Sequence, residues 1–239
     1  MRNLNEVIED IGMGKYQILQ LMVLSGIWVS DGAEVLIASC ILGGLKEAWG
    51  LSSVVKGAMM SMIFIGVCCG NLIGGTLADT QGRRKTVLIA YAGIVGFGLC
   101  SSFADGPYSL MALRFVFGCF YGIGVGPSIT LQIETSPAAW RGHLVNFGCI
   151  FFAVGEVFAA CLMVWFMPNI DGLEAAKNWR FLTALSVVPG VLLFPFAVLL
   201  LQESPHFLVS RGRPQEAAAS VRAIAYMCGR EDLMEEFKP

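Results

Sequence analysis

Charged residues are scarce in this chain. Asp, Glu, Lys and Arg make up 14% of its 239 residues, whereas hydrophobic residues make up 56%. Soluble globular domains carry about 25% charged residues. The shortage of charge argues against an ordinary soluble domain and favours a chain with much lipid-facing surface.

Signals of catalysis are also missing. No nucleophile is paired with a general base, no glycine-rich loop is suited to phosphate, and no metal-ligand spacing occurs. We therefore expect no enzyme, no cofactor and no metal site. The net charge of −2 argues neither for nor against nucleic acid, and no nucleic-acid partner is expected. The chain has no Asn-x-Ser/Thr acceptor, so glycosylation cannot report its topology.

Signals of secretion are weak. The first 17 residues contain Glu6, Glu9 and Asp10, which do not suit the cationic start of a signal peptide. Of the eight cysteines, all but Cys228 lie inside apolar runs. A thiol in such a run usually behaves as a small hydrophobic side chain. The cysteines therefore do not predict a disulfide framework.

What the sequence does have is six long apolar runs. A spanning helix needs about 20 mostly apolar residues, and in lipid it satisfies its own backbone hydrogen bonds. Strands of a β-barrel would alternate in polarity, which these runs do not. The sequence predicts an all-α membrane protein with six transmembrane helices, at residues 18–42, 54–78, 86–103, 108–133, 144–167 and 181–201.

Three regions follow from the predicted spans. Residues 1–17 are expected to form a cytoplasmic N-terminal segment, residues 18–201 the six-helix bundle, and residues 202–239 a cytoplasmic tail. Within the tail, a polar stretch with Ala, Val and Ile runs over residues 214–227 and begins with Pro214. Proline is favoured in the first turn of a helix, so we expect a short amphipathic surface helix there.

The cations in the loops predict the orientation. Short cytoplasmic loops carry an excess of Lys and Arg, and the tight hairpin after the second span has three in a row. If this hairpin is cytoplasmic, both termini are too, and eleven cations lie inside against four outside. The inside set is Arg2, Lys15, Arg83, Arg84, Lys85, Arg141, Arg211, Arg213, Arg222, Arg230 and Lys238. The outside set is Lys46, Lys56, Lys177 and Arg180.

Ionisable residues inside the spans point to a function. They are costly in a bilayer and by default mark a pathway or a coupling site. Asp31 lies near the middle of the first span, and Glu34 shares its helix face. Arg114 stays charged and, by helical rise, lies at a similar depth to Asp31. We predict that Asp31 pairs with Arg114 and carries a proton. The alternatives are a purely structural Asp31 and an Arg114 that snorkels outward.

The remaining charges are open to two interpretations. Glu156 in the fifth span either faces the cavity or pairs within the bundle. Asp79, Arg83, Glu134 and Arg141 are expected to gather on the cytoplasmic side. They form either a latch between helix ends or a solvated surface network, in which each pair contributes little.

Glycines are dense in two of the spans. The second span contains Gly66, Gly70, Gly74 and Gly75, and the fourth contains Gly118, Gly122, Gly124 and Gly126. Small residues at a spacing of four let helices approach closely. They serve packing alone, or they also belong to faces that slide during transport.

The hairpin resembles a known family. Residues 75–84, GTLADTQGRR, are similar to the loop between helices two and three of the major facilitator superfamily, G-x-L-A-D-x-x-G-R-R/K. The resemblance extends over nearly all of the chain, from residue 11 to about residue 225. It implies the amino-terminal six-helix half of a transporter, built as a 3+3 repeat.

Further motifs are similar to those of sugar porters and organic-ion transporters. They are RFVFGCFYG from Arg114, ETSPAAWRG from Glu134 and ESPHFL from Glu203. The surroundings of Asp31 and Glu134 are most similar to synaptic-vesicle-two-related transporters and aromatic-acid/proton symporters. Three departures argue against a strict sugar porter: Leu131 replaces Tyr, Gln202 replaces Pro, and His206 replaces Arg.

The resemblance implies a secondary transporter of a small organic solute or ion that works by alternating access. Proton coupling and the substrate cavity are expected at Asp31, Glu34, Arg114 and Glu156. A conformational gate is expected at Gly75, Asp79, Gly82, Arg83, Arg84, Glu134, Arg141 and Glu203.

The expected partners are the lipid bilayer, the solute, protons and a second six-helix half. That half could come from the same gene, a separate chain or a second copy. The alternative function is a membrane interaction or sensor protein, or a fragment, that keeps the half-fold without transporting.

Overall fold

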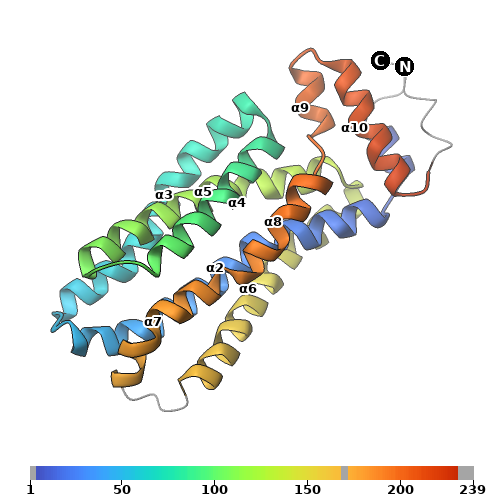
Figure 1. Cartoon of the computed structure of the whole chain (residues 1–239). Coiled ribbons are helices and arrows are strands. Elements are labelled where there is room, and N and C mark those ends of the chain that lie inside the picture. Colours follow the sequence, from blue (N-terminus) through green and yellow to red (C-terminus); the bar gives the residue numbers. More distant parts are fainter. Residues whose placement is uncertain (1–3, 168–171, 231–239) are drawn as a thin grey trace.

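The computed structural model describes residues 4–167 and 172–230, and within these ranges the chain forms helices and loops without strands (Figure 1). Ten helices are seen there. They are α1 (Leu4–Ile11), α2 (Lys15–Ala48), α3 (Ser53–Gln81), α4 (Arg83–Ser101), α5 (Pro107–Glu134), α6 (Ala138–Phe166), α7 (Gly172–Ser186), α8 (Val188–Leu200), α9 (Pro205–Ser210) and α10 (Pro214–Met227). Two cations of the predicted inside set, Arg2 and Lys238, lie outside the described residues.

The six predicted spans all form helices that run along one bundle (Figure 1). Among the described residues, five stretches are long and apolar enough to cross a membrane. They are Lys15–Ala48, Ser53–Gln81, Pro107–Glu134, Ala138–Phe166 and Lys177–Leu200. The third predicted span, α4, has 19 residues and is not among them. Its first three residues are cations, which shorten its apolar length.

The sixth predicted span consists of two helices. α7 ends at Ser186 and α8 begins at Val188, so the column is interrupted at Val187. Pro189 is the second residue of α8, and a proline has no backbone N–H to donate to the preceding turn. The break therefore comes from the sequence itself.

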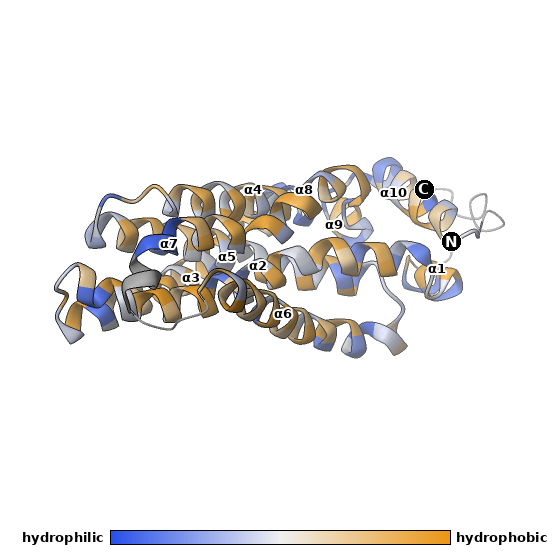
Figure 2. Cartoon of the chain, turned by 60° about the horizontal axis from the view of Figure 1, so that its bottom comes forward, coloured by the Kyte–Doolittle hydropathy of each residue, from blue (hydrophilic) through white to orange (hydrophobic). Residues whose placement is uncertain are grey.

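Apolar residues follow the length of the bundle, and hydrophilic residues are concentrated toward its two ends (Figure 2). Large hydrophobic side chains are exposed on α3 and α6, including Leu72 at 75%, Val157 at 63% and Val164 at 71%. Such faces would be unfavourable in water and suit lipid or another apolar helix.

Glycines bring two helix pairs into backbone contact. A Cβ added to Gly70 on α3 would lie 2.1 Å from the carbonyl oxygen of Cys119 on α5. One added to Gly118 on α5 would lie 2.2 Å from the carbonyl oxygen of Ile63. α2 and α6 meet in the same way at Gly32 and Gly155. Only glycine permits such an approach, so glycine at these positions serves the close packing of the helices.

The two glycine contacts are equivalent under a 3+3 repeat. The first three spanning helices are α2, α3 and α4, and the second three are α5, α6 and the α7–α8 column. When the first triplet is placed on the second, the α2–α6 pair falls on the α5–α3 pair. The pairing of helices in the structure thus agrees with the predicted internal repeat.

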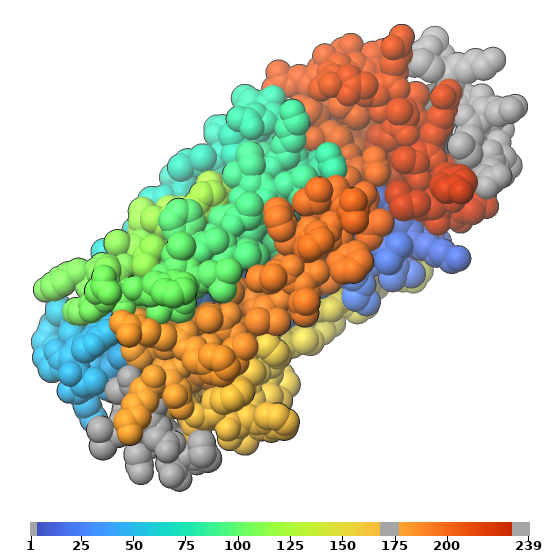
Figure 3. Space-filling model, viewed as in Figure 1, coloured from blue at the N-terminus to red at the C-terminus, as the bar shows by residue number. Residues whose placement is uncertain are grey.

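Short helices cover one end of the bundle, here called the α1–α10 end. α9 and α10 sit beside the hairpin that joins α3 to α4 (Figure 3). Apolar residues of α1, including Val7 and Ile11, pack with Val221 and Ile224 of α10. α10 occupies the residues predicted for a surface helix, whereas α1 and α9 were not predicted. The first spanning helix begins at Lys15, three residues earlier than expected.

We expect Gly70→Ala to lower the thermal unfolding temperature of the detergent-solubilised chain. Its Cβ would collide with backbone, so the cost is about 1–3 kcal/mol. The matched control is Gly126→Ala on α5, where a Cβ meets nothing within 4 Å. Alanine favours helix over glycine by about 1 kcal/mol, so the control should be neutral or stabilising. Equal unfolding temperatures for the two variants would contradict the close α3–α5 contact.

Candidate functional site

A buried ion pair lies in the interior of the bundle. The guanidinium of Arg114 on α5 donates through Nη1 to Oε1 of Glu34 on α2. The hydroxyl of Ser186 at the end of α7 donates to the other carboxylate oxygen, Oε2. Glu34 and Ser186 are 0% exposed and Arg114 is 3% exposed. Three helices from both halves of the repeat therefore meet at one carboxylate.

The predicted pairing of Arg114 with Asp31 is wrong, because the partner of Arg114 is Glu34. Asp31 and Glu34 differ by three residues, or about 4.5 Å of helical rise. A comparison of depths by helical rise does not resolve that difference, because the long arginine side chain reaches over it. Arg114 is buried and paired, so it does not snorkel to the surface.

The polar interior is not fully satisfied. Nη2 of Arg114 and Oγ1 of Thr183 are buried without a hydrogen-bond partner among the described residues. An unpaired buried donor costs about 1–3 kcal/mol, and more when it is charged. The pair is thus held in place by its surroundings at some energetic cost, as is common at functional sites.

Asp31 lies one turn from Glu34 in a different setting. Its carboxyl lies near the hydroxyl of Tyr121 on α5, and the residue is 6% exposed. Tyr121 contacts Trp28 edge-to-face, with ring centroids 6.4 Å apart. Within the described residues, Asp31 has no ion-pair partner within 4 Å.

Glu156 is half-buried on α6, beside α2. A Cβ at Gly32 would lie 3.3 Å from the backbone nitrogen of Glu156, which places this turn of α6 next to Asp31 along α2. Among the described residues, no hydrogen bond or ion pair of the Glu156 side chain is seen. Of the two interpretations of Glu156 given above, the structure therefore does not show pairing within the bundle.

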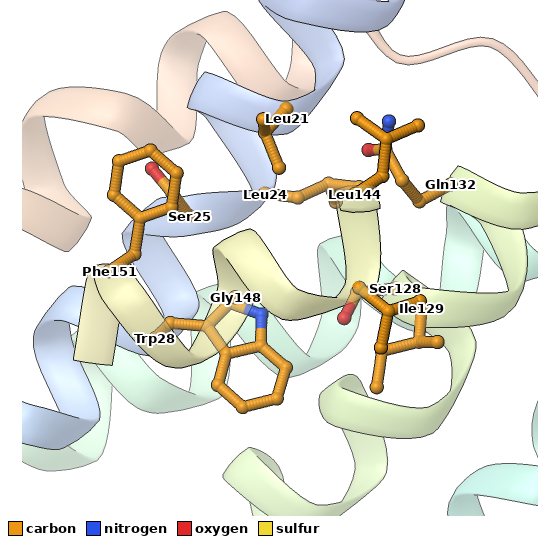
Figure 4. Close-up of a pocket in the computed structure, with 11 residues that line it drawn as sticks. Leu21, Leu24, Ser25, Trp28, Ser128, Ile129, Gln132, Leu144, Gly148 and Phe151 are labelled. Atoms are coloured by element: carbon orange, nitrogen blue, oxygen red, sulfur yellow. The ribbon is translucent and has the colours of Figure 1, made fainter. Parts of the chain in front are cut away.

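A small cavity opens between α2, α5 and α6 (Figure 4). Its volume is about 20 Å³, enough for a water molecule. Trp28 and Phe151 contribute aromatic walls, and Ser25, Ser128 and Gln132 contribute polar groups. A ligand pocket usually measures about 300–1,000 Å³. This cavity is therefore too small to hold a solute, and its lining could form only one side of a solute site.

The charges at the α1–α10 end form the second cluster, called here the end cluster. Arg83 at the start of α4 lies 3.3 Å from a carboxylate oxygen of Asp79 and 3.3 Å from one of Glu134 at the end of α5. Arg83 also stacks over the ring of Phe207 at 5.1 Å. The structure thus brings Asp79, Arg83 and Glu134 together at the α1–α10 end, as expected.

Glu203 stabilises the start of α4 in the end cluster. Its Oε1 accepts from the backbone nitrogen of Arg84 at 3.0 Å, across 119 residues of chain. A carboxylate at a helix N-terminus is favoured by the unpaired N–H groups there. Gly82 precedes the helix at φ 105°, and a Cβ there would lie 2.3 Å from Oε2 of Glu203. The positive φ requires glycine here, and a Cβ would also displace the Glu203 carboxylate from the start of α4.

Arg141 and His206 border the end cluster. Arg141 donates through Nε to the carbonyl of Ser136 at 3.1 Å. With Asn5 and Glu134, both residues line a surface pocket of about 240 Å³. Burial lowers the pKa of His206, and Arg141 and Arg83 lower it further, while Glu134 opposes this effect. Arg141 therefore neighbours Glu134 in the pocket.

The remaining predicted gate residues, Gly75 and Arg84, differ in their contacts. Gly75 stands on the open side of α3, where a Cβ would meet nothing within 4 Å. The guanidinium of Arg84 donates to the carbonyl of Val198 on α8, at 2.7 Å, and so anchors α4 to the last spanning column.

No group of three or more His, Cys, Asp or Glu in the described part of the chain could hold a metal ion.

Sequence reasoning missed two members of the interior site, Ser186 and Tyr121. Serine and tyrosine are common in membrane helices, and their spacing gives no signal of contact with α2. Pro189, three residues after Ser186, signals an interruption of the column, but it does not indicate which side chain turns inward.

Six helical columns with paired charges inside and a charged hairpin at one end define a membrane protein of the major facilitator fold, built as one half of it. Residues 17–238 match the family described as "Sugar (and other) transporter". The chain belongs to this family, whose members are transporters and not enzymes. It is an integral, multi-pass membrane protein.

Three proteins illustrate the similarity in sequence. The chain is 32% identical over 222 residues to synaptic vesicle 2-related protein of Bos taurus, covering 92% of this chain and 38% of the relative. It is 32% identical over 224 residues to organic cation/carnitine transporter 7 of Arabidopsis thaliana, covering 93% and 43%. It is 30% identical over 223 residues to the gallate transporter of Pseudomonas putida, covering 93% and 48%.

Solved structures show the same fold. The proton:xylose symporter XylE bound to 6-bromo-6-deoxy-D-glucose superposes with a TM-score of 0.76 at 19% identity, covering 93% of this chain and 53% of that one. The inward open conformation of the xylose transporter XylE from E. coli gives 0.72 at 20% identity, with 92% and 55% covered. The chain thus spans about two fifths to one half of the length of the proteins it matches.

The buried pair generates a stability prediction. Glu34→Gln should lower stability by about 3–5 kcal/mol, because it leaves the Arg114 charge buried without a counter-charge. The double variant Glu34→Gln/Arg114→Gln should recover part of this loss. Arg213→Gln is the control, since its pair with Glu216 is about half exposed and should contribute at most about 1 kcal/mol. Thermal unfolding in one detergent compares them, and a double variant less stable than Glu34→Gln would argue against the pair.

His206 generates a pH prediction. Its pKa in the folded chain lies below its ordinary value near 6.5, so the folded state binds the proton more weakly than the unfolded state. The stability contribution is therefore complete above about pH 6.5 and is lost as pH falls below it. The unfolding temperature should fall less between pH 7.5 and 5 in His206→Gln than in the parent chain.

His143→Gln is the matched control for this measurement, because His143 is the second histidine of the chain and is exposed. An unchanged pH dependence in His206→Gln, or the same change in both variants, would refute the role of His206.

Proposed function

We propose that this chain is the amino-terminal half of a proton-coupled secondary transporter for a small organic solute or ion, which works by alternating access. The observation that carries the proposal is the Glu34–Arg114 pair, buried where three spanning helices meet. Intramembrane charges that are paired in a bundle interior are typical of coupling sites.

The pair provides a physical route from proton to conformation. A proton on Glu34 removes the negative charge that holds Arg114, and Arg114 itself stays charged. The guanidinium then requires a new partner or water, which favours a different arrangement of α2, α5 and α7. Proton coupling thus rests on Glu34, and Asp31 remains available for another role.

A second six-helix half supplies the missing wall of the solute site. The cavity of about 20 Å³ is too small for a solute, and the relatives are about twice as long. The exposed apolar residues of α3 and α6 offer a surface for that half. It comes from the same gene, a separate chain or a second copy of this chain, related by an axis along the membrane normal.

The α1–α10 end is proposed to face the cytoplasm, since it carries the hairpin cations and most of the remaining Lys and Arg. There the end cluster acts as a latch. Arg83 ties α4 to α5, and Glu203 ties the segment after α8 to α4. Opening toward the cytoplasm would release some of these contacts without touching the interior pair.

The test is uptake into proteoliposomes under an imposed pH gradient. The chain is reconstituted alone and with any co-purifying six-helix partner, and radiolabelled xylose, benzoate and tetraethylammonium serve as probes. Saturable accumulation of at least one probe is expected. Glu34→Gln should abolish accumulation driven by the gradient and retain exchange, whereas the exposed Glu216→Gln should behave like the parent.

Unchanged gradient-driven accumulation in Glu34→Gln would overturn proton coupling at this pair. Absence of any saturable uptake, with the chain shown to be folded and paired with a second unit, would favour the alternative of a non-transporting membrane protein.

A further inference from the structure

We infer that a pocket between the start of α4 and the helices α9 and α10 binds the headgroup of a phosphorylated inositol lipid. This pocket, called here the tail pocket, has a volume of about 420 Å³. Gln81, Arg84 and Lys85 line it from the hairpin, Gln202 from the segment after α8, and Arg213 from the start of α10. The inference rests on the proposed cytoplasmic orientation of the α1–α10 end.

Two cations of the tail pocket have hydrogen-bond donors to spare. A guanidinium has five N–H donors, and that of Arg84 makes one hydrogen bond, to the carbonyl of Val198. Lys85 is exposed, and its ammonium has no hydrogen bond or ion pair in the part of the chain that the structure describes. A phosphate that enters the pocket therefore finds charged donors that the protein leaves open.

The two carboxylates of the tail pocket are already engaged. Glu203 accepts from the backbone nitrogens of Arg84 and Ser204, both at 3.0 Å. Glu216 accepts two hydrogen bonds from the guanidinium of Arg213. With three cations and two carboxylates among its lining residues, the pocket keeps one uncompensated positive charge. This balance favours an anionic ligand.

Two amide side chains suit a headgroup that carries hydroxyls as well as phosphate. The side chains of Gln81 and Gln202 line the pocket and have no hydrogen-bond partner among the described residues. An amide both donates and accepts, as a hydroxyl does. The pocket is also more than ten times the volume of about 30 Å³ that a water molecule occupies in the liquid, so a bare phosphate ion would fill little of it. A phosphorylated inositol offers phosphate and hydroxyls in one ligand.

The tail pocket adjoins the lipid-facing surface of α4 and α8, with α9 and α10 beyond the ends of these two helices (Figure 1). Lys85 and Ile89 lie one turn apart on α4, and both are exposed. Leu199 near the end of α8 is 74% exposed, directly after the residue whose carbonyl Arg84 holds. Acyl chains can thus lie against these apolar side chains while the headgroup fills the pocket. Basic pockets on the cytoplasmic side of membrane helices are suited to such lipids.

The test is equilibrium binding to the full chain in detergent, with its six-helix partner where one co-purifies. The main probe is dioctanoyl phosphatidylinositol 4-phosphate. Its deacylated form, glycerophosphoinositol 4-phosphate, tests for a soluble phosphate ester as the ligand. Dioctanoyl phosphatidic acid tests for phosphate without the polyol, and dioctanoyl phosphatidylcholine tests for a neutral headgroup. Saturable binding of the main probe is expected, at least about tenfold tighter than binding of the other three.

Lys85→Gln should weaken binding of the main probe by about fivefold and Lys85→Glu by about 25-fold, since one cation near an anionic lipid contributes about fivefold in affinity. Lys85→Arg retains the charge and should retain binding. The matched control is Arg222→Gln, which removes an exposed cation of α10 that does not line the pocket and should leave binding unchanged.

Equally tight binding of the deacylated headgroup would overturn a membrane lipid as the ligand, and equally tight binding of phosphatidic acid would overturn the inositol. Binding that is unchanged in both Lys85→Gln and Lys85→Glu would overturn the tail pocket as the site. No binding of the main probe to a chain that unfolds cooperatively would overturn the inference and leave the transport proposal standing, because the measurement uses neither solute nor gradient. Absent uptake with lipid binding retained would count against transport alone.

Discussion

The Glu34–Arg114 ion pair is the constraint on which the rest of the structure depends. A charge in the bilayer interior is tolerated only where a partner is provided, so α2 and α5 must bring these two side chains together. Ser186 on α7 donates a hydrogen bond to the second oxygen of the Glu34 carboxylate. Because α2 belongs to the first triplet of the repeat and α5 and α7 to the second, this one contact joins the two triplets at their centre.

Backbone packing supplies the rigidity that such a pair needs. At the glycine contacts between α3 and α5 and between α2 and α6, carbonyl groups of one helix fill the space that a side chain would take on the other. These faces therefore serve packing inside the bundle.

Composition and motif were sufficient to predict the helical membrane fold, the repeat and the end cluster, because each depends on residues close in sequence or on a contiguous pattern. The interior site was predicted in its members, Asp31, Glu34 and Arg114, and not in its pairing. Which of the two acids pairs with Arg114 depends on how the helices are rotated about their axes, and Asp31 and Glu34 lie only one turn apart. A hydrophobic run in the sequence does not indicate that rotation. The helix α1 was missed for the related reason that its apolar face is defined only by contact with α10.

Helix α5 connects the interior pair to the end cluster. Arg114 and Glu134 are 20 residues apart on it, or about 30 Å. Between them stands Pro127, which has no N–H for the carbonyl of Ile123, and a Cβ at Gly74 of α3 would lie 2.7 Å from that same oxygen. The part of α5 near Arg114 is fixed by its glycine contacts, whereas the part near Glu134 is held by Arg83 beyond the proline. In the proposed mechanism, a proton on Glu34 therefore acts on one segment of α5 and the latch acts on the other. In the same proposal, Pro127 separates the latch from the α3–α5 contact, so that the latch opens without breaking that contact.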